Sequence, residues 1–163
     1  MTASIVTLPA DDPVIIIVRE FDAPRTLVFK AFTDPFHLVH FWGPHGATNP
    51  VCEMDVRPGG LWRQVMRFPD GSEYGHDSLY LEVVEPERLV YRDVPRGSDG
   101  VLERLPPPEM VTTMLFEDLA GRTKLTAHIR AMSTAARDQA VKMGFARTVE
   151  QAQDRLEAYL RTL

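Results

Sequence analysis

Apolar and polar residues alternate with a period of two through the middle of the chain, which is the pattern of strands that bury one face. The alternation runs from residue 51 to residue 130, and turn signals such as Pro58-Gly59-Gly60 divide it at hairpin spacing. Short strands joined by tight turns predict an antiparallel meander. We expect strands at residues 51–57, 61–68, 73–85, 89–93, 110–118 and 122–130, and a further strand in the β-branched segment 14–21.

The segment between the first strand and the meander carries start and stop signals for two short helices. Asp22 is a typical helix cap, and Pro24 suits a first turn, where its missing N–H would have no helical partner. Pro35 ends this helix. Asp34 and Pro35 together repeat the start signal for a second helix, which we expect to reach Trp42 before a Gly-Pro stop.

The C-terminal segment shows a helical period instead, and Ser133 or Thr134 is its expected cap. Gly144 marks either a bend, a close backbone approach or a tolerated helix glycine. If the apolar stripe is core, Leu156→Ala should be strongly destabilising, whereas Arg155→Ala should cost little. The stripe consists of Val141, Phe145, Val149, Ala152, Leu156, Tyr159, Leu160 and Leu163.

A stripe of this length must lie against another apolar surface, and the sheet is the only large one that the pattern predicts. We therefore expect an α+β fold in which a seven-stranded curved antiparallel sheet surrounds a long C-terminal helix. The length of 163 residues and the hydrophobic fraction of 44% suit one domain over residues 1–163. Residues 1–13 show no periodicity and are expected to be irregular.

Charge and composition narrow the classes of partner. The net charge is -5 and no block of basic residues occurs, so nucleic acid is not an expected partner. The longest apolar run, residues 14–18, is too short to span a bilayer, and the N-terminus lacks the features of a signal peptide. We expect no membrane insertion and a cytoplasmic location. The single cysteine, Cys52, excludes an internal disulfide and is expected to be a small buried residue.

A twisted sheet that curls round one helix leaves space near the N-terminal end of that helix, and such space is either filled core or a ligand pocket. Trp62, Gln64 and Met66 are expected to point inward because Arg63 and Arg67 alternate with them. Leu125, Ala127 and Ile129 are the inward set of their strand. Residues 110, 112, 114 and 116 are preferred on the strand before it, although the opposite set is nearly as apolar.

These faces predict a pocket for an apolar small molecule, with Trp42 and the second short helix at its entrance and the polar end of the ligand directed to Gln64. The expected ligand-binding residues are Trp42, Trp62, Gln64, Met66, Tyr91, Met114, Phe116 and Phe145.

Two groups of polar residues are candidates for a metal site or an acid–base pair. His37, His40 and His45 lack a matched carboxylate spacing, so surface or half-buried packing is expected and no metal site. Glu53, Asp55 and Arg57 alternate along one strand; the arginine between the carboxylates favours an ion network over an acid–base pair.

No nucleophile motif, phosphate loop, dinucleotide fingerprint or paired-cysteine zinc spacing occurs in the sequence. We therefore expect no cofactor and no catalytic residue, and whether the protein is an enzyme stays open.

Four segments together resemble a known superfamily: residues 19–44 (REFDAPRTLVFKAFTDPFHLVHFWGP), 53–60 (EMDVRPGG), 66–74 (MRFPDGSEY) and 79–91 (LYLEVVEPERLVY). They are similar to the SRPBCC, or START-like, superfamily, which includes the birch pollen allergen and polyketide cyclases. The subgroup that they resemble is named after the activator of the ninety-kilodalton heat-shock-protein ATPase. The resemblance implies a helix-grip fold with the order β-α-α-β6-α.

The resemblance also supplies alternatives to small-molecule binding. Some relatives are cyclases or hydratases that use polar groups in the same pocket, and Gln64, Tyr80, Tyr91 and Asp55 would be the candidates here. A chaperone-associated protein-binding domain is the third class, and a homodimer is left open. Residues 94–109, rich in Gly and Pro, form a loop longer than the family usual, which we expect to be mobile and dispensable for folding.

Overall fold

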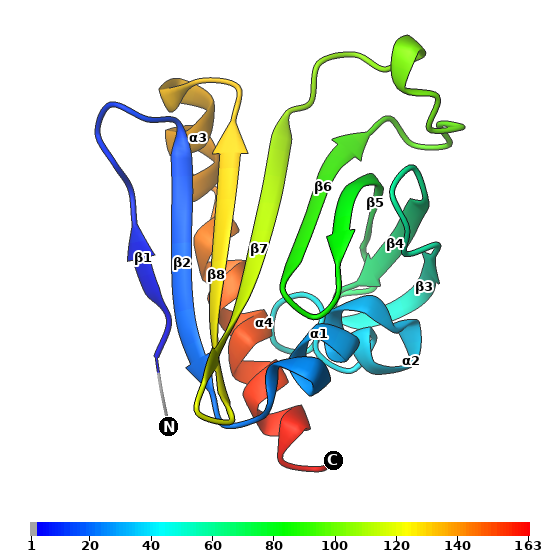
Figure 1. The fold of residues 1–163 in the computed structure, drawn as a ribbon. Helices are drawn as coiled ribbons and strands as arrows, with labels where there is room; N and C mark the ends of the chain where they lie inside the picture. The colour runs from blue at the N-terminus through cyan, green and yellow to red at the C-terminus, as the bar shows by residue number, and fades with distance from the viewer. Residues whose placement is uncertain (1–2) are drawn as a thin grey trace.

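A curved antiparallel sheet wrapped around the C-terminal helices is the dominant feature of the computed structural model, which describes residues 3–163 (Figure 1). Its described strands run in the order β1-β2-β8-β7-β6-β5-β4-β3. They are β1 (Ile5–Thr7), β2 (Val14–Phe21), β3 (Thr48–Met54), β4 (Leu61–Arg67), β5 (Glu73–Val84), β6 (Arg88–Val94), β7 (Met110–Leu119) and β8 (Arg122–Ala131). The helices are α1 (Arg25–Thr33), α2 (Pro35–Leu38), the 3-10 turn η1 (Leu102–Arg104), α3 (Thr134–Lys142) and α4 (Phe145–Leu160).

The predicted meander and helix-grip architecture are confirmed, with one additional strand at the edge. β1 pairs with β2 in antiparallel register, Ile5 opposite Val18. The described sheet therefore has eight strands instead of the expected seven. A strand of three residues is too short to show a period in the sequence, which is why the segment was expected to be irregular. Residues 1–2 of that segment lie outside the described residues.

The turn after β3 shows why its boundaries differ from the expected strand at 51–57. β3 begins at Thr48 and ends at Met54. The chain then forms a tight turn, which is closed by a hydrogen bond from Gly60 N to the Arg57 carbonyl at 2.8 Å. A Cβ at Gly60 would lie 1.9 Å from the Asp55 carbonyl oxygen, so only glycine fits this position.

The two helices after β2 follow their start signals with one exception. Asp34 caps α2 as expected, with its carboxylate accepting from the backbone N of Phe36 at 2.9 Å. The residue at the cap of α1 is Pro24, which makes no side-chain cap bond, so the expected capping by Asp22 is wrong. α2 ends at Leu38, and single turns continue the chain to Trp42.

The long C-terminal helix is divided into α3 and α4 by a bend at Gly144. Its φ of +97° is a conformation that only glycine adopts without strain. Space is not the reason for a glycine, because a Cβ there would meet no atom within 4 Å. Of the three interpretations of Gly144, a bend, a close backbone approach or a tolerated helix glycine, the bend is therefore correct. Ser133 caps α3 by accepting from Ala136 N at 3.0 Å.

The inward faces predicted from alternation are confirmed. Leu125, Ala127 and Ile129 are buried on β8. Leu156, which is 0% exposed, joins the largest core cluster with residues of α1, the strands and the α2–β3 segment. Leu156 and Leu160 of the C-terminal stripe are therefore core, whereas Leu163 is 54% exposed.

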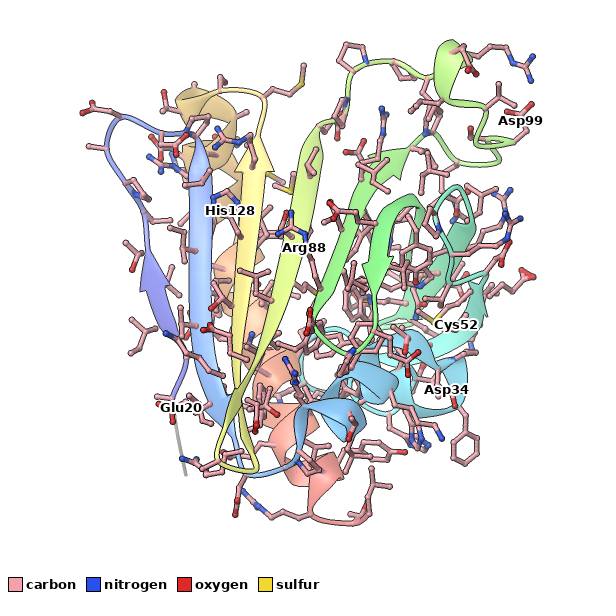
Figure 2. The ribbon with its side chains drawn as sticks, in the orientation of Figure 1. Glu20, Asp34, Cys52, Arg88, Asp99 and His128 are labelled. Atoms are coloured by element: carbon pink, nitrogen blue, oxygen red, sulfur yellow. The ribbon has the colours of Figure 1, made fainter. Side chains whose placement is uncertain are left out.

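The loop of residues 94–109 is anchored to the body, contrary to the expectation of a free segment. Asp77, only 2% exposed, pairs with Arg96 at 2.7 Å and accepts from the backbone N of Gly97 at 2.8 Å. Arg63 pairs with the same carboxylate at 2.7 Å and donates to the Ser98 carbonyl. Only the far part, around Asp99 in Figure 2, projects outward. The anchoring carboxylate belongs to β5 and not to the loop, so the composition of the loop does not indicate these bonds.

None of the described helices is both long and apolar enough to cross a membrane.

Candidate ligand-binding cavity

A cavity of about 1000 Å³ lies between the inner face of the sheet and the helices α3 and α4. Strands β4 to β8 provide one wall, and the two helices with the bend at Gly144 provide the other. A volume of this size is at the upper end of the range for pockets that hold small molecules. Most of the wall is apolar, with Met66, Met114, Ile129, Phe145, Val149 and Ala152 among its residues.

Five of the eight sequence-predicted site residues line this cavity, and three do not. Those on the wall are Trp42, Met66, Tyr91, Met114 and Phe145. Those absent from the wall are Trp62, Gln64 and Phe116, all of which are buried.

Gln64 faces inward as predicted, but it does not reach the cavity. Its side-chain oxygen accepts from Trp62 Nε1 at 2.9 Å, and its side-chain nitrogen donates to Asn49 Oδ1 at 2.8 Å. Asn49 in turn donates to the carbonyl of Trp42 at 3.1 Å. The expected role of Gln64 toward the polar end of a ligand is therefore corrected. The amide links the strand to the backbone of the entrance segment.

Trp62 and Phe116 form a layer behind the wall. The Trp62 ring packs edge-on against Trp42, with 4.9 Å between centroids, and against Tyr91 at 5.2 Å. Phe116 packs against Phe29 of α1 at 5.1 Å. These side chains fill the end of the sheet that α1 covers. The open cavity therefore lies beyond this layer of aromatic rings.

His76 was not predicted as a site residue, but it lines the cavity from β5. Its Nε2 lies 3.3 Å from Trp42 Nε1, a hydrogen bond in which the indole donates. Burial lowers the pKa of His76 to about 4, and the nearby Arg96 acts in the same direction while Asp77 opposes it. His76 lies opposite Gln64 in the pairing of β4 with β5. Because residues directly opposite each other point to the same face, the inward direction predicted for Gln64 also predicts that His76 points inward.

Tyr91 and Thr112 face each other across β6 and β7 on the same wall. Burial raises the pKa of Tyr91 to about 12, and a hydrogen bond with Thr112 acts in the opposite direction. The phenol is therefore neutral at physiological pH.

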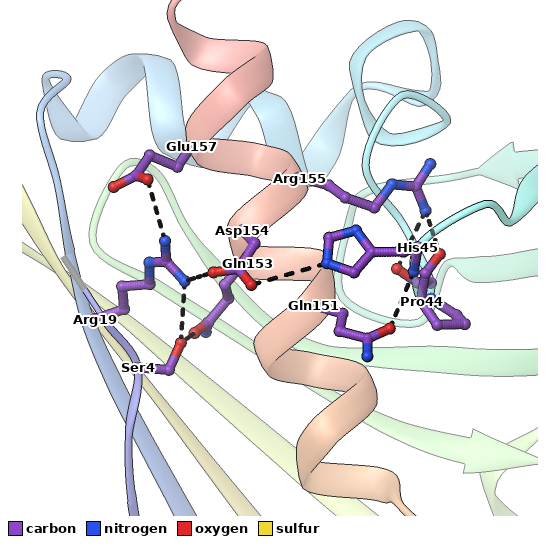
Figure 3. Close-up of polar contacts among 10 residues, drawn as sticks. Ser4, Arg19, Pro44, His45, Gln151, Gln153, Asp154, Arg155 and Glu157 are labelled. Carbon is purple, nitrogen blue, oxygen red and sulfur yellow. Dashed lines mark hydrogen bonds and ion pairs between the residues drawn. The ribbon is translucent and has the colours of Figure 1, made fainter. Parts of the chain in front are cut away.

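Arg155 of α4 holds the predicted entrance segment, residues 42–47, in place (Figure 3). Its guanidinium donates to the carbonyl oxygens of Trp42 and Pro44 at 2.9 Å each, and to those of Gly43 at 3.1 Å and Ala47 at 3.0 Å. Three of those residues, 42–44, line the cavity. The expectation that Arg155 contributes little is therefore wrong, because it satisfies a group of loop carbonyls that no helix or strand pairs.

The opposite side of α4 is bound to the sheet through a buried arginine (Figure 3). Arg19 of β2 is 2% exposed and pairs with Asp154 and Glu157, the latter at 3.3 Å. It also donates to Ser4 Oγ, which donates to Gln153. The helix is thus fixed to the sheet on one side and to the entrance segment on the other.

The predicted histidine and carboxylate groups lie away from the cavity. Among residues 3–163 no three His, Cys, Asp or Glu side chains are grouped as metal ligands. His37 Nδ1 lies 2.6 Å from the hydroxyl of Tyr159, and the His40 ring stacks on the same tyrosine. Asp55 and Arg57 form an exposed pair at 2.9 Å.

Cys52, and Tyr80 from the residues considered for catalysis, also lie off the cavity wall. Burial raises the pKa of the half-buried Cys52 to about 11, and Asp34, its neighbour in Figure 2, adds to the effect. The buried hydroxyl of Tyr80 has no hydrogen-bond partner in the described chain. Of the four residues considered for catalysis, Tyr80 and Tyr91 pair across β5 and β6, with their rings edge-on at 6.3 Å between centroids. Asp55 is exposed and the amide of Gln64 is bonded to Trp62 and Asn49, so the four do not form one site.

Comparison with known proteins agrees with the fold and with the resemblance in the sequence. A family model described as Activator of Hsp90 ATPase homolog 1-like protein matches residues 22–161. A solved structure from Mycobacterium smegmatis has a TM-score of 0.84 at 27% identity, covering 98% of this chain and 98% of that one. One from Nitrosomonas europaea has a TM-score of 0.83 at 25% identity, covering 95% and 97%. No curated protein matches the chain.

Proposed function

The chain belongs to the Activator of Hsp90 ATPase homolog 1-like family, and from that premise we propose that it binds an apolar small molecule in the cavity between the sheet and the helices α3 and α4. The observation that carries this proposal is the cavity itself. About 1000 Å³ of space lies inside a wall that is mostly apolar. Protein interiors are normally packed to the density of organic crystals, so an apolar molecule in this space would gain contacts that the side chains of the wall lack.

The arrangement of the entrance supports the same conclusion. Met132 and Met143 line the cavity although they are 63% and 78% exposed, so they mark the side on which it meets solvent. Methionine side chains adapt their shape to different partners, which suits the mouth of an apolar pocket. The segment of Trp42 to Pro44, which also lines the cavity, is held by Arg155, so this part of the wall is fixed.

An enzyme of cyclase or hydratase type receives less support. Asp55 is exposed, while Gln64 and Tyr80 are off the cavity wall, which leaves Tyr91 as the one wall residue of the four. The alternative of a chaperone-associated protein-binding domain is supported by the family alone. We therefore favour a ligand-binding function.

The test is a titration with N-phenyl-1-naphthylamine, an apolar dye whose emission rises when it leaves water. The wild-type protein should bind it saturably with a dissociation constant well below about 1 mM, a limit that corresponds to only about 4 kcal/mol. Ala152→Phe should weaken this binding, because Ala152 lines the cavity and a phenyl ring there takes up part of the volume open to the dye.

The matched control is Ala158→Phe on the same helix, at an exposed position off the cavity wall. It should bind the dye as the wild type does. Both variants are checked for a cooperative melting transition. No saturable binding by the wild type, or equal binding by a folded Ala152→Phe protein, contradicts the proposal.

A further inference from the structure

The cavity wall has an unusual charge composition for a pocket that would hold a lipid-like molecule. Among the described residues that line it, there is no lysine and no arginine, and the acidic residues are Asp93 and Glu109. Asp93 Oδ1 accepts from the backbone N of Met110 at 2.7 Å, which holds this carboxylate at the wall. A carboxylate or phosphate on a ligand would therefore lose its hydration and meet negative charge with no cation to pair with.

The arginines around the cavity are committed elsewhere. Arg92 donates to the carbonyl oxygens of Asp93 and Pro106, and Arg96 pairs with Asp77. Arg155 donates to the carbonyl oxygens of the entrance segment. None of these side chains lines the cavity. The wall thus disfavours anionic ligands.

The same wall offers hydrogen-bond donors to a neutral ligand. Because Trp42 Nε1 can only donate, the Nε2 that it contacts on His76 must be the unprotonated nitrogen. The neutral ring then carries its proton on Nδ1, so its donor is the nitrogen that does not contact Trp42. Since His76 lines the cavity, the contact with Trp42 fixes the tautomer that leaves a donor for a ligand.

A second donor lies beside the first. Ser78 is two residues along β5 from His76, so both side chains are on the same face of the strand. Ser78 lines the cavity, and its hydroxyl is able to donate to a ligand there. One oxygen atom of a ligand can accept from both groups, because a carbonyl oxygen has two lone pairs.

Resting on the proposed function, we propose that the cavity selects uncharged apolar molecules that carry a carbonyl oxygen, such as long-chain ketones, with His76 Nδ1 and the Ser78 hydroxyl as donors, and that it discriminates against the corresponding carboxylic acids. The apolar chain of the ligand extends along Met114, Ile129 and Phe145.

The experiment compares 2-undecanone with decanoic acid as competitors for bound N-phenyl-1-naphthylamine at pH 8, where the acid is ionised. The ketone should displace the dye at a concentration at least about tenfold lower than the acid, because the anion must be desolvated without a partner. Equal or tighter binding of decanoate overturns the inference.

Three variants test the donor. In His76→Phe, the affinity for 2-undecanone relative to that for the dye should fall by roughly 5- to 10-fold, the usual effect of one lost hydrogen bond. His76→Asn keeps an N–H near the position of Nδ1 and should restore most of the ratio. His128→Phe, on the outer face of β8, is the matched control. An unchanged ratio in His76→Phe refutes the role of His76, whereas failure of the dye itself to bind refutes the cavity and the proposed function.

Discussion

Arg155 shows at the scale of one residue how a helix can shape a binding site without touching the ligand. It lies on α4 between residues of the apolar stripe, and its donors reach the carbonyl oxygens of the loop that forms one rim of the cavity. An arginine suits this task because its planar group presents five N–H donors in fixed directions. Nη1 contacts the carbonyls of residues 42–44 and Nη2 contacts that of Ala47, whereas lysine has only one nitrogen to offer.

We predict that Arg155→Ala lowers the free energy of unfolding by about 1.5 to 3 kcal/mol, the range for hydrogen bonds made by a charged group. Urea denaturation followed by circular dichroism measures this. Arg161→Ala is the control, because the side chain of Arg161 is 62% exposed and makes a single-residue ion pair, with Glu157 at 3.1 Å. Equal midpoints for the two variants would mean that the loop does not depend on Arg155.

Leu156, the next residue, gives the opposite case, in which the sequence pattern was sufficient. Leu156→Ala should lower the free energy of unfolding by about 2 to 5 kcal/mol, since it deletes a fully buried side chain. Leu163→Ala, at a position that is 54% exposed, should change it little. A comparison of their thermal melts in which both variants behave alike would argue against α4 as the central core helix.

The inward faces of β4, β7 and β8 could be predicted from alternation because a strand turns every second side chain to the same face. Alternation does not say how deep a side chain lies, so Trp62 and Gln64 were expected at the cavity and were found one layer behind it. The contacts of Arg155 could not be predicted either, because they join residues more than 100 positions apart in the sequence.

At the scale of elements, periodicity predicted every strand of the meander and both short helices. It missed β1, which is too short to show a period, and it left three explanations for Gly144. Composition, in turn, predicted that the loop of residues 94–109 is mobile, whereas the structure shows it anchored. That segment has the composition of a free loop, and the acid that anchors it is Asp77 on β5.

We predict that Asp77→Ala frees this loop. Arg96 and Arg104, two arginines of the loop, should then be cut by trypsin at least about tenfold faster than in the wild type, since cleavage follows the population of the opened segment. Asp99→Ala removes an exposed pair with Arg104 and should leave the cleavage rate within about twofold. Limited proteolysis followed by mass spectrometry measures both rates. A resistant loop in a folded Asp77→Ala protein would show that other contacts anchor it.

At the scale of the whole molecule, the sheet and the last helices enclose more space than their side chains fill. The sheet curls because antiparallel strands twist, and the bend at Gly144 sets α3 and α4 along different parts of its inner face. Layers of rings fill the end under α1, whereas methionines and small residues line the rest. The cavity results from the curvature of the sheet together with the bend between α3 and α4. No single helix or strand produces it.

The measurement that tests this account most directly is NMR of protein labelled with ¹³C at the methionine methyl groups, with 2-undecanone added. Met66 and Met114 lie on opposite parts of the cavity wall, on β4 and β7, and Met54 lies on β3 off the wall. We predict intermolecular nuclear Overhauser effects from the ketone chain to the methyl groups of Met66 and Met114 and none to that of Met54. Contacts confined to exposed methyl groups, or no contact at a saturating ketone concentration, would contradict the claim that this cavity is the binding site.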